Sequence, residues 1–212
     1  MGPGVIGVME AAGWIGRLTA VTAYEQGAQG LWEGSWEAEL VQRAQSFEHE
    51  ALGILYQHFY PRLYNYAYLH LGEIHRAQDL ASDVMLKVLE ALPRYRQRGV
   101  PFAAWVFRIA RNRLIDEARR NRRRKQEPLA EDLPDGGPSA HTLAERSADR
   151  QRLRQALADL TEDQRQVVIL RFIVGMETAA VARALGRGEG AVKALQHRAL
   201  LALRKRLRED SG

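Results

Sequence analysis

The 212-residue sequence contains no cysteine, and this absence removes several classes of protein at once. Disulfide frameworks, thiolate zinc sites and cysteine nucleophiles are all excluded, and a reducing cytoplasm fits the composition. Lysine is scarce as well, since 27 of the 31 cations are arginine. Arginine suits planar, bidentate recognition of phosphate and guanine edges, although a G+C-rich genome would give the same bias. With a net charge of +5, the composition favours a polyanionic partner.

The sequence also lacks a long apolar run. Residues 4–23 are mildly apolar, but no basic segment precedes them, and Glu10 and Arg17 interrupt them. We therefore expect no signal peptide, no membrane insertion and a cytoplasmic location. Residues 1–36 are interpreted as a weakly ordered N-terminal extension.

From Trp36 onward the apolar residues recur at helical spacing, and no convincing alternating strand is present. Apolar residues through Phe59 predict one helix, and Pro61 is expected to begin the next. The clearest case is residues 74–92, which Pro93 should end. Their core-facing side comprises Ile74, Ala77, Leu80, Ala81, Val84, Met85, Val88 and Leu92.

The opposite side of residues 74–92 carries an acidic stripe. Asp79, Asp83, Leu86 and Glu90 follow one another at spacings of four, three and four, which places three carboxylates around an exposed leucine. The stripe is either a solvated face or a docking surface for a basic partner. Metal ligation is a third possibility, but no histidine or further carboxylate completes a coordination shell.

Residues 102–125 begin like a buried helix and end like a polycation. Phe102, Trp105, Val106 and Ile109 share one side, whereas another side carries Arg108, Arg111, Asn112, Arg119 and Arg122. Nine cations face only two acids between Arg108 and Lys125. Aromatic residues and arginines also alternate in the preceding loop, at Tyr95, Arg96 and Arg98. This pattern favours binding of unstacked bases, against the alternatives of a solvated basic run and a Trp105 that serves only the core.

A Pro/Gly-rich, acidic segment at residues 126–146 then predicts an interdomain linker. In the C-terminal part, Thr161 and Gln164 form a capping-box signature. Ala182 and Gly186, followed by a second apolar helix, give helix-turn-helix spacing, with Val181, Leu185, Val192 and Leu195 packing the two helices together. The outward residues near the start of the second helix are Gly190, Lys193, Ala194, His197 and Arg198. His197 is alternatively a plain surface histidine.

Three segments in this order carry a family resemblance: AQDLASDVMLKVLEAL (77–92), FAAWVFRIARNRLIDEARR (102–120) and the segment 160–204, which begins LTEDQRQ. Over residues 38–208 the chain resembles the extracytoplasmic-function sigma factors of bacterial RNA polymerase. The resemblance implies an all-α protein of two small helical domains joined by a flexible linker. Residues 37–125 would form sigma region 2, residues 126–146 the linker, and residues 147–208 the region 4 helix-turn-helix.

The resemblance also implies partners and site residues. Core RNA polymerase would be bound through the clamp helices of its largest subunit and the flap of the second-largest, and an anti-sigma factor would be a further partner. The polymerase contacts would be Asp79, Leu80, Asp83, Leu86 and Glu90. The minus-10 promoter element would be read by Arg96, Arg98, Phe102, Trp105, Arg108, Asn112, Asp116, Arg119 and Arg120. The minus-35 element would be read by Gly190, Lys193, Ala194, His197 and Arg198. The family implies no cofactor and no metal.

Several positions depart from the usual family pattern, namely Ser82, Ala180, Val181, Glu189, Gly190 and Ala194. They bear on which minus-35 sequence is read. Two other classes compete with the family interpretation. An enzyme is disfavoured because no paired catalytic carboxylates or Gly-rich phosphate loop are present. A stand-alone helix-turn-helix regulator explains the C-terminal part but leaves the acidic stripe and residues 102–125 without a purpose.

Overall fold

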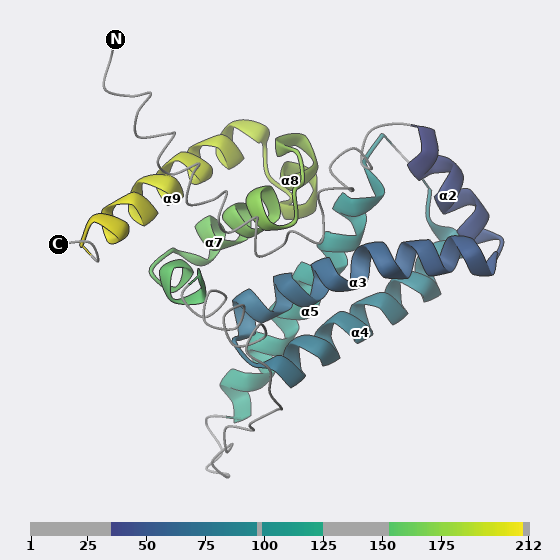
Figure 1. The fold of residues 1–212 in the computed structure, drawn as a ribbon, viewed down its shortest axis with the longest axis horizontal. Helices are drawn as coiled ribbons and strands as arrows, with labels where there is room; N and C mark the ends of the chain where they lie inside the picture. Colours follow the sequence, from purple (N-terminus) through teal and green to yellow (C-terminus); the bar gives the residue numbers. More distant parts are fainter. Residues whose placement is uncertain (1–34, 97–98, 125–152, 210–212) are drawn as a thin grey trace, which may run out of the picture.

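The computed structural model describes residues 35–96, 99–124 and 153–209, with side chains for residues 37–96, 99–120 and 153–206. Within these ranges the chain is helical and contains no strand, which confirms the predicted all-α class. Residues 1–34 of the predicted extension, the linker at 126–146 and Arg98 lie outside the described residues, whereas Ser35 and Trp36 begin a helix. Figure 1 shows the two groups of helices lying side by side.

In the described part of the N-terminal domain there are four α-helices and one short 3₁₀ turn. They are α2 (Ser35–Gln45), α3 (His49–Leu71), α4 (Ile74–Ala91), η2 (Leu92–Arg94) and α5 (Phe102–Arg124). Helix α4 packs along α3, α5 packs against α4, and α2 contacts α3. Gly72 ends α3 in the left-handed conformation (φ 78°), and its N–H donates to the Tyr68 carbonyl at 2.8 Å. Glycine adopts this conformation without strain.

Aromatic side chains join α3 to α5 in the core of this domain. The Phe59 and Phe102 rings meet edge to face at 5.4 Å, and the Tyr66 and Phe107 rings do so at 5.6 Å. All four side chains are buried. Burying each large apolar side chain contributes about 1.5–3 kcal/mol, so these contacts fix the N-terminal half of α5 against α3.

Pro61 does not begin a new helix, and the prediction that it does is wrong. It lies inside the single helix α3. A proline costs an interior helix about 3 kcal/mol, because it lacks the N–H that would bond one turn back. Leu55, Phe59 and Leu63, on both sides of Pro61, are buried in the same core, and their packing offsets that loss.

The predicted core-facing side of residues 74–92 is wrong at one position. Ile74, at the start of α4, is 50% exposed and does not belong to the core.

The C-terminal domain contains a short helical segment at residues 153–158, α7 (Glu162–Val168), α8 (Thr178–Leu185) and α9 (Glu189–Glu209). The capping box at the start of α7 is confirmed: the Thr161 side chain accepts from the Gln164 N–H, and the Gln164 side chain accepts from the Thr161 N–H. Helix α7 continues as a π-helical turn, η3 (Ile169–Ile173), which the sequence did not predict.

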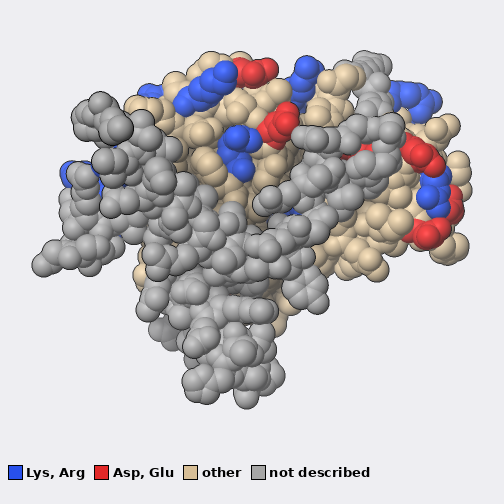
Figure 2. All heavy atoms as spheres, turned by 45° about the horizontal axis from the view of Figure 1, so that its top comes forward, with Lys and Arg blue, Asp and Glu red and all other residues tan. Residues whose placement is uncertain are grey.

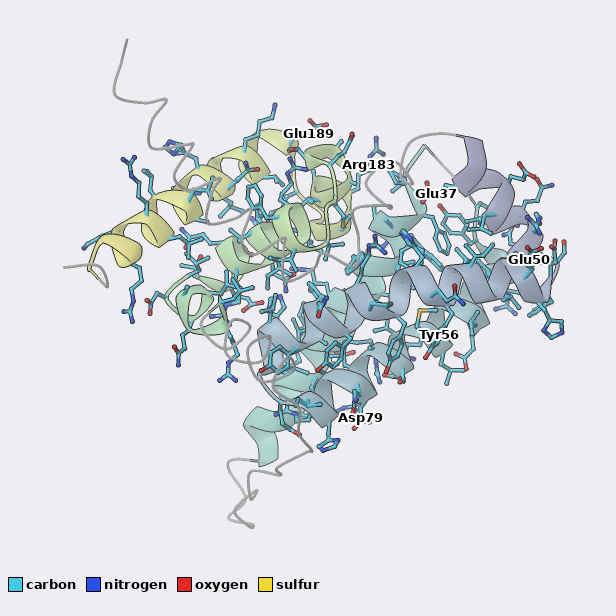
Figure 3. All side chains as sticks on the ribbon, in the orientation of Figure 1. Glu37, Glu50, Tyr56, Asp79, Arg183 and Glu189 are labelled. Atoms are coloured by element: carbon cyan, nitrogen blue, oxygen red, sulfur yellow. The ribbon has the colours of Figure 1, made fainter. Side chains whose placement is uncertain are left out.

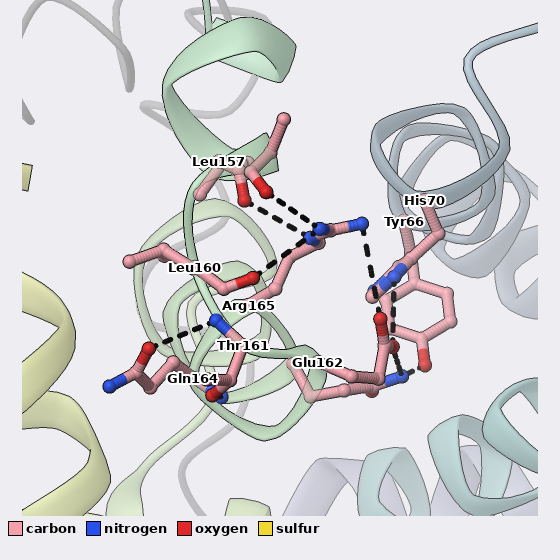
Figure 4. A network of polar contacts seen from close by, with 10 residues as sticks. Tyr66, His70, Leu157, Leu160, Thr161, Glu162, Gln164 and Arg165 are labelled. Carbon is pink, nitrogen blue, oxygen red and sulfur yellow. Dashed lines mark hydrogen bonds and ion pairs between the residues drawn. The ribbon is translucent and has the colours of Figure 1, made fainter.

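The two domains are in direct contact. Helix α8 packs against α5, and η3 packs against α3. The Tyr66 hydroxyl of α3 donates to Gln166 Oε1 of α7 at 2.6 Å, and Arg154 Nη1 donates to the Gly72 carbonyl at 2.8 Å. Figure 4 shows Tyr66 and His70 facing the start of α7. The sequence analysis predicted two domains but no interface between them.

Candidate nucleic-acid and polymerase interfaces

The first candidate site surrounds Trp105, near the start of α5. The Trp105 ring lies 4.7 Å from the Tyr95 ring and 5.2 Å from the Phe102 ring, measured between centroids. Trp105 is half-buried, whereas Phe102 is only 1% exposed. Phe102 therefore supports Trp105 from within the core, and one part of the indole remains accessible. Such a surface can stack an unpaired base.

This aromatic cluster borders a cavity of about 370 Å³. The cavity is lined by Arg94, Tyr95, Arg96, Val100, Ala104, Trp105, Arg108 and Arg183. Its lining thus combines four guanidinium groups with two aromatic rings and contains no carboxylate. The combination suits a ligand that carries both phosphate and a planar base.

The remaining predicted minus-10 residues lie further along α5. Asn112, Asp116, Arg119 and Arg120 are exposed. Asp116 Oδ1 lies 3.9 Å from Arg119 Nη1, so part of the cationic surface is internally balanced. On the described part of the face that Figure 2 shows, basic side chains are separated by acidic and neutral ones.

The N-terminus of α5 is held by a residue that the sequence analysis did not identify. Glu37 of α2 is 7% exposed, and its Oε1 has no hydrogen-bond partner among the described residues. The other carboxylate oxygen is therefore the acceptor for the backbone N–H groups of Ala103 and Phe102. Burial raises the pKa of Glu37, and these two hydrogen bonds oppose that rise. The residue before the helix is Pro101, which has no side chain able to cap. An uncapped start of this kind is the signal that a cap must come from another element.

The second candidate site is the acidic stripe on α4. Asp79 and Glu90 are exposed, Leu86 is 55% exposed, and Asp79 projects away from the rest of the domain (Figure 3). Two of the five predicted polymerase contacts are not exposed and unpaired, as the prediction requires. Leu80 is 6% exposed and belongs to the core. Asp83 is not free, because its carboxylate pairs with Arg113 of α5.

Below this stripe, α4 and α5 enclose a smaller cavity of about 230 Å³. It is lined by Arg76, Asp79, Leu80, Asp83, Arg113, Glu117 and Arg120. Arg76 Nη2 donates to Glu117 Oε1 at 3.0 Å, so charges of both signs meet here. Ion pairs therefore connect α4 to α5. The free part of the stripe is reduced to Asp79, Leu86 and Glu90.

The third candidate site is the helix-turn-helix formed by α8 and α9. Gly186 adopts the left-handed conformation (φ 65°) at the turn, as the spacing predicts. The expected packing residues Val181, Leu185, Val192 and Leu195 are all buried. The predicted DNA-contacting residues all stand exposed near the start of α9, namely Gly190, Lys193, Ala194, His197 and Arg198. Exposed side chains at the N-terminal part of the second helix can reach base edges in the major groove.

No residue set that would suggest catalysis or a resident ion emerges from the described part of the chain. Among those residues, no group of three or more His, Asp or Glu side chains could hold a metal ion. None of the described helices is long and apolar enough to cross a membrane.

The comparisons with known proteins agree with this geometry. The Sigma-70 region 2 family matches residues 55–124, and the Sigma-70 region 4 family matches residues 156–205. The chain is 34% identical to the ECF RNA polymerase sigma factor BldN of Streptomyces coelicolor, over 82% of the chain and 66% of BldN. It is also 34% identical to ShbA of Streptomyces griseus, over 78% of the chain and 92% of ShbA.

Two solved structures share the fold. CnrH, in complex with the cytosolic domain of CnrY, matches with a TM-score of 0.65 and 24% identity, over 83% of this chain and 99% of that one. The sigma factor RpoE of Bartonella quintana, in complex with the anti-sigma factor NepR, matches with a TM-score of 0.61 and 25% identity. This match covers 74% of this chain and 96% of RpoE.

The chain thus carries region 2 and region 4 of a Sigma-70-type sigma factor. It belongs to the extracytoplasmic-function (ECF) sigma factors of RNA polymerase. As a member, it binds core RNA polymerase and directs promoter-specific transcription. Sigma factors are regulatory proteins rather than enzymes. The alternative of a stand-alone helix-turn-helix regulator is set aside because region 2 is present.

Proposed function

We propose that the cavity around Trp105 receives unpaired bases of the minus-10 element. Unstacking a base costs a few kcal/mol, which stacking and phosphate contacts must offset. Trp105 supplies the stacking surface, while Arg96 and Arg108 hold the backbone phosphates. Asn112, one turn beyond Arg108, offers an amide that can donate to and accept from a base edge. Asp116, Arg119 and Arg120 follow the strand further along α5, with Arg98 contributing from the preceding loop. Phe102 acts indirectly, by supporting Trp105.

The start of α9 reads the minus-35 element as duplex DNA. Lys193 and Arg198 are the residues that can contact either phosphate or guanine, and both are exposed. His197 lies between them on the same face. Gly190 and Ala194 have no polar side chain, so their part is to let the helix approach the groove closely. The small residues make sequence selection depend on Lys193, His197 and Arg198.

On the polymerase side, the docking contacts on α4 are Asp79, Leu86 and Glu90. An exposed leucine between two carboxylates fits a basic partner surface that also has an apolar pocket. Asp83 and Leu80 contribute by fixing α4 in position, through Arg113 and the core respectively. The solved relatives in complex with CnrY and NepR support an anti-sigma factor as a further partner. The protein would act in the cytoplasm, where its polymerase is, and would perform no catalysis of its own.

One observation carries this proposal: a cationic and aromatic cavity, lined by region 2 together with Arg183 of region 4, and an exposed recognition helix on region 4 occur in the same chain. Run-off transcription with cognate core polymerase and a library of genomic promoter fragments tests it. We expect discrete start sites that depend on the protein, and Trp105→Ala should reduce transcript yield at least tenfold.

A matched control distinguishes the loss of the cavity's stacking surface from the loss of any exposed aromatic side chain. Tyr56, on α3, is 48% exposed, stacks on Tyr60 at 5.0 Å and lies outside the cavity. Tyr56→Ala should therefore transcribe like the unsubstituted protein. Absence of any start-site selection would overturn the proposed function, and equal losses for Tyr56→Ala and Trp105→Ala would overturn the role of the cavity.

A further inference from the structure

Helix α2 contacts both segments of region 2 that surround Trp105. It precedes the part of the chain that matches the Sigma-70 region 2 family. Near the start of α2, the Glu37 carboxylate accepts from the Phe102 and Ala103 N–H groups, where α5 begins (Figure 3). At the end of α2, Gln45 contacts η2. One short helix therefore holds the backbone on both sides of the indole.

The contact of Gln45 with η2 consists of two hydrogen bonds from one amide group. Gln45 Nε2 donates to the Leu92 carbonyl at 2.9 Å and to the Tyr95 carbonyl at 2.8 Å. A carbonyl oxygen can only accept, so the side chain must present its NH₂ group to both partners, and both of its N–H donors are used. Gln45 therefore fixes the backbone at the two ends of the η2 turn.

Tyr95 connects this backbone to the indole. The Tyr95 side chain is 9% exposed, and its ring lies 4.7 Å from the Trp105 ring and 5.1 Å from the Phe102 ring, measured between centroids. The Tyr95 hydroxyl also donates to the Val100 carbonyl at 3.4 Å. Because the three rings are packed together, a shift of the Tyr95 backbone changes the surface on which the indole rests.

The Tyr95 carbonyl has a second donor, Arg96, whose Nη1 lies 3.2 Å away. Arg96 is exposed and lines the cavity, where its guanidinium can contact a phosphate of DNA. A guanidinium that turns toward a phosphate gives up its contact with the carbonyl. Gln45 is then the donor that keeps Tyr95 in place.

We propose that Gln45 is a positioning residue for minus-10 recognition: it holds Tyr95, and thereby keeps the Trp105 indole in the orientation that stacks an unpaired base. The proposal rests on the proposed role of the Trp105 cavity. A base that is not held there cannot align its edge with Asn112, because a hydrogen bond weakens steeply when it is misaligned. The loss of Gln45 should therefore reduce the discrimination between minus-10 sequences and leave the reading of minus-35 duplex unchanged.

Run-off transcription with the holoenzyme measures this discrimination as a ratio of yields. One promoter selected from the fragment library is compared with versions that carry the most damaging single-base change in the minus-10 element or in the minus-35 element. A smaller amount of folded protein lowers all yields alike and leaves both ratios unchanged. For Gln45→Leu we expect the minus-10 ratio to fall roughly fivefold, because each lost hydrogen bond changes an equilibrium constant by a factor of about 2–10. The minus-35 ratio should stay the same.

Two polar substitutions at the same position keep the test independent of the folding of Gln45→Leu. Gln45→Glu has nearly the same shape but presents ionised acceptor oxygens to the two carbonyls, so it should also lose minus-10 discrimination. Gln45→Lys keeps N–H donors and should retain most of it. Gln42 is an exposed glutamine on the same helix and provides the matched control. Gln42→Glu adds the same charge and should discriminate like the unsubstituted protein.

Unchanged minus-10 ratios in Gln45→Leu and Gln45→Glu would overturn the positioning role, and so would a parallel fall of the minus-10 and minus-35 ratios. Equal losses in Gln45→Lys and Gln45→Glu would overturn the role of the donated hydrogen bonds. In each of these cases the unsubstituted protein still selects start sites, and the proposed function stands. An absence of start-site selection by the unsubstituted protein would overturn the proposed function and the positioning role with it, so the two failures are distinguishable.

Discussion

Asp83 on α4 and Arg113 on α5 form an ion pair between the helix proposed to bind polymerase and the helix proposed to read DNA. The side chains are 34% and 23% exposed, so the pair is only partly screened by water. Asp79 lies one turn earlier on α4 and is exposed. Two carboxylates of the same stripe therefore have different roles, one structural and one available to a partner.

This difference predicts opposite results for two substitutions. Asp79→Lys should weaken binding to core polymerase by roughly 10- to 100-fold, because like charges brought together at an interface cost several kcal/mol. Its thermal stability should stay unchanged, as for most surface substitutions. Asp83→Asn should instead reduce the free energy of unfolding by about 1 kcal/mol through the loss of its charged partner.

Affinity chromatography with core polymerase, together with thermal unfolding followed by circular dichroism, checks both results. Glu39→Lys, an exposed charge reversal on α2, is the control and should change neither quantity. Normal polymerase binding by Asp79→Lys would argue against the proposed docking surface.

The region 4 prediction concerns Lys193 and Arg198. Replacing either residue with alanine should weaken binding to minus-35 duplex by about 1–3 kcal/mol if it contacts a base. A residue that contacts only phosphate should weaken binding to all sequences alike and reduce the slope of log K against log salt by about 1. Fluorescence anisotropy at several salt concentrations distinguishes the two roles. Lys205→Ala, an exposed cation near the other end of α9, should have little effect on specificity.

The sequence predicted the helices and the local turns well, because their signals are short-range. The capping box at Thr161 and the left-handed turn at Gly186 depend on residues within one or two turns of each other. The acidic stripe was also recognised from spacing alone, but its pairing was not. Spacing shows which face a residue occupies, whereas the partner of Asp83 comes from a helix 30 residues away.

Long-range contacts account for what the sequence analysis missed. Pro61 was expected to start a helix, because a local rule cannot weigh the packing of Leu55, Phe59 and Leu63 around it. The contact between the two domains could not be predicted for a similar reason. Tyr66 and Gln166 are separated by 100 residues, and nothing in either local sequence indicates the other.

Glu37 leads to a prediction about stability and pH. Burial raises the pKa of its carboxyl group in the folded state above its ordinary value of 4.5. The folded protein therefore holds this proton more tightly than the unfolded chain does, and stability is lost as the pH rises from about 4.5 through the folded pKa. Glu37→Gln keeps an oxygen acceptor for the N–H groups of Phe102 and Ala103 but carries no charge, so this loss should disappear.

Thermal unfolding between pH 4 and pH 8 measures the effect. The melting temperature of Glu37→Gln relative to the unsubstituted protein should increase with pH. Glu37→Ala leaves the start of α5 without its acceptor and should cost about 1–2 kcal/mol at all pH values. Parallel pH profiles for the Gln variant and the unsubstituted protein would contradict the assignment.

The last prediction concerns how the contact between the two domains depends on pH. Burial lowers the pKa of His70, whose surroundings are the Tyr66 ring at 4.8 Å, the Glu162 carboxylate and the Arg165 guanidinium. The His70 imidazole, whose Nδ1 lies 3.3 Å from Glu162 Oε1, lowers the pKa of Glu162 to about 2. For His70 the unfolded or undocked state binds the proton more readily, so the docked state loses stability as the pH falls below 6.5. For Glu162 the loss begins below 4.5 and continues toward the folded pKa.

Both shifts therefore favour opening as the pH decreases, with His70 acting first. Because the sequence has no cysteine, dyes can be attached at Glu39→Cys on α2 and Ala202→Cys on α9, two exposed positions. Energy transfer between them should fall between pH 7 and pH 5, before the protein unfolds. His70→Gln replaces the imidazole with a side chain that does not titrate, and it should remove most of this pH dependence. His75→Gln, on an exposed position of α4, is the control and should retain it. A pH profile shared by His70→Gln and the unsubstituted protein would show that His70 does not control docking.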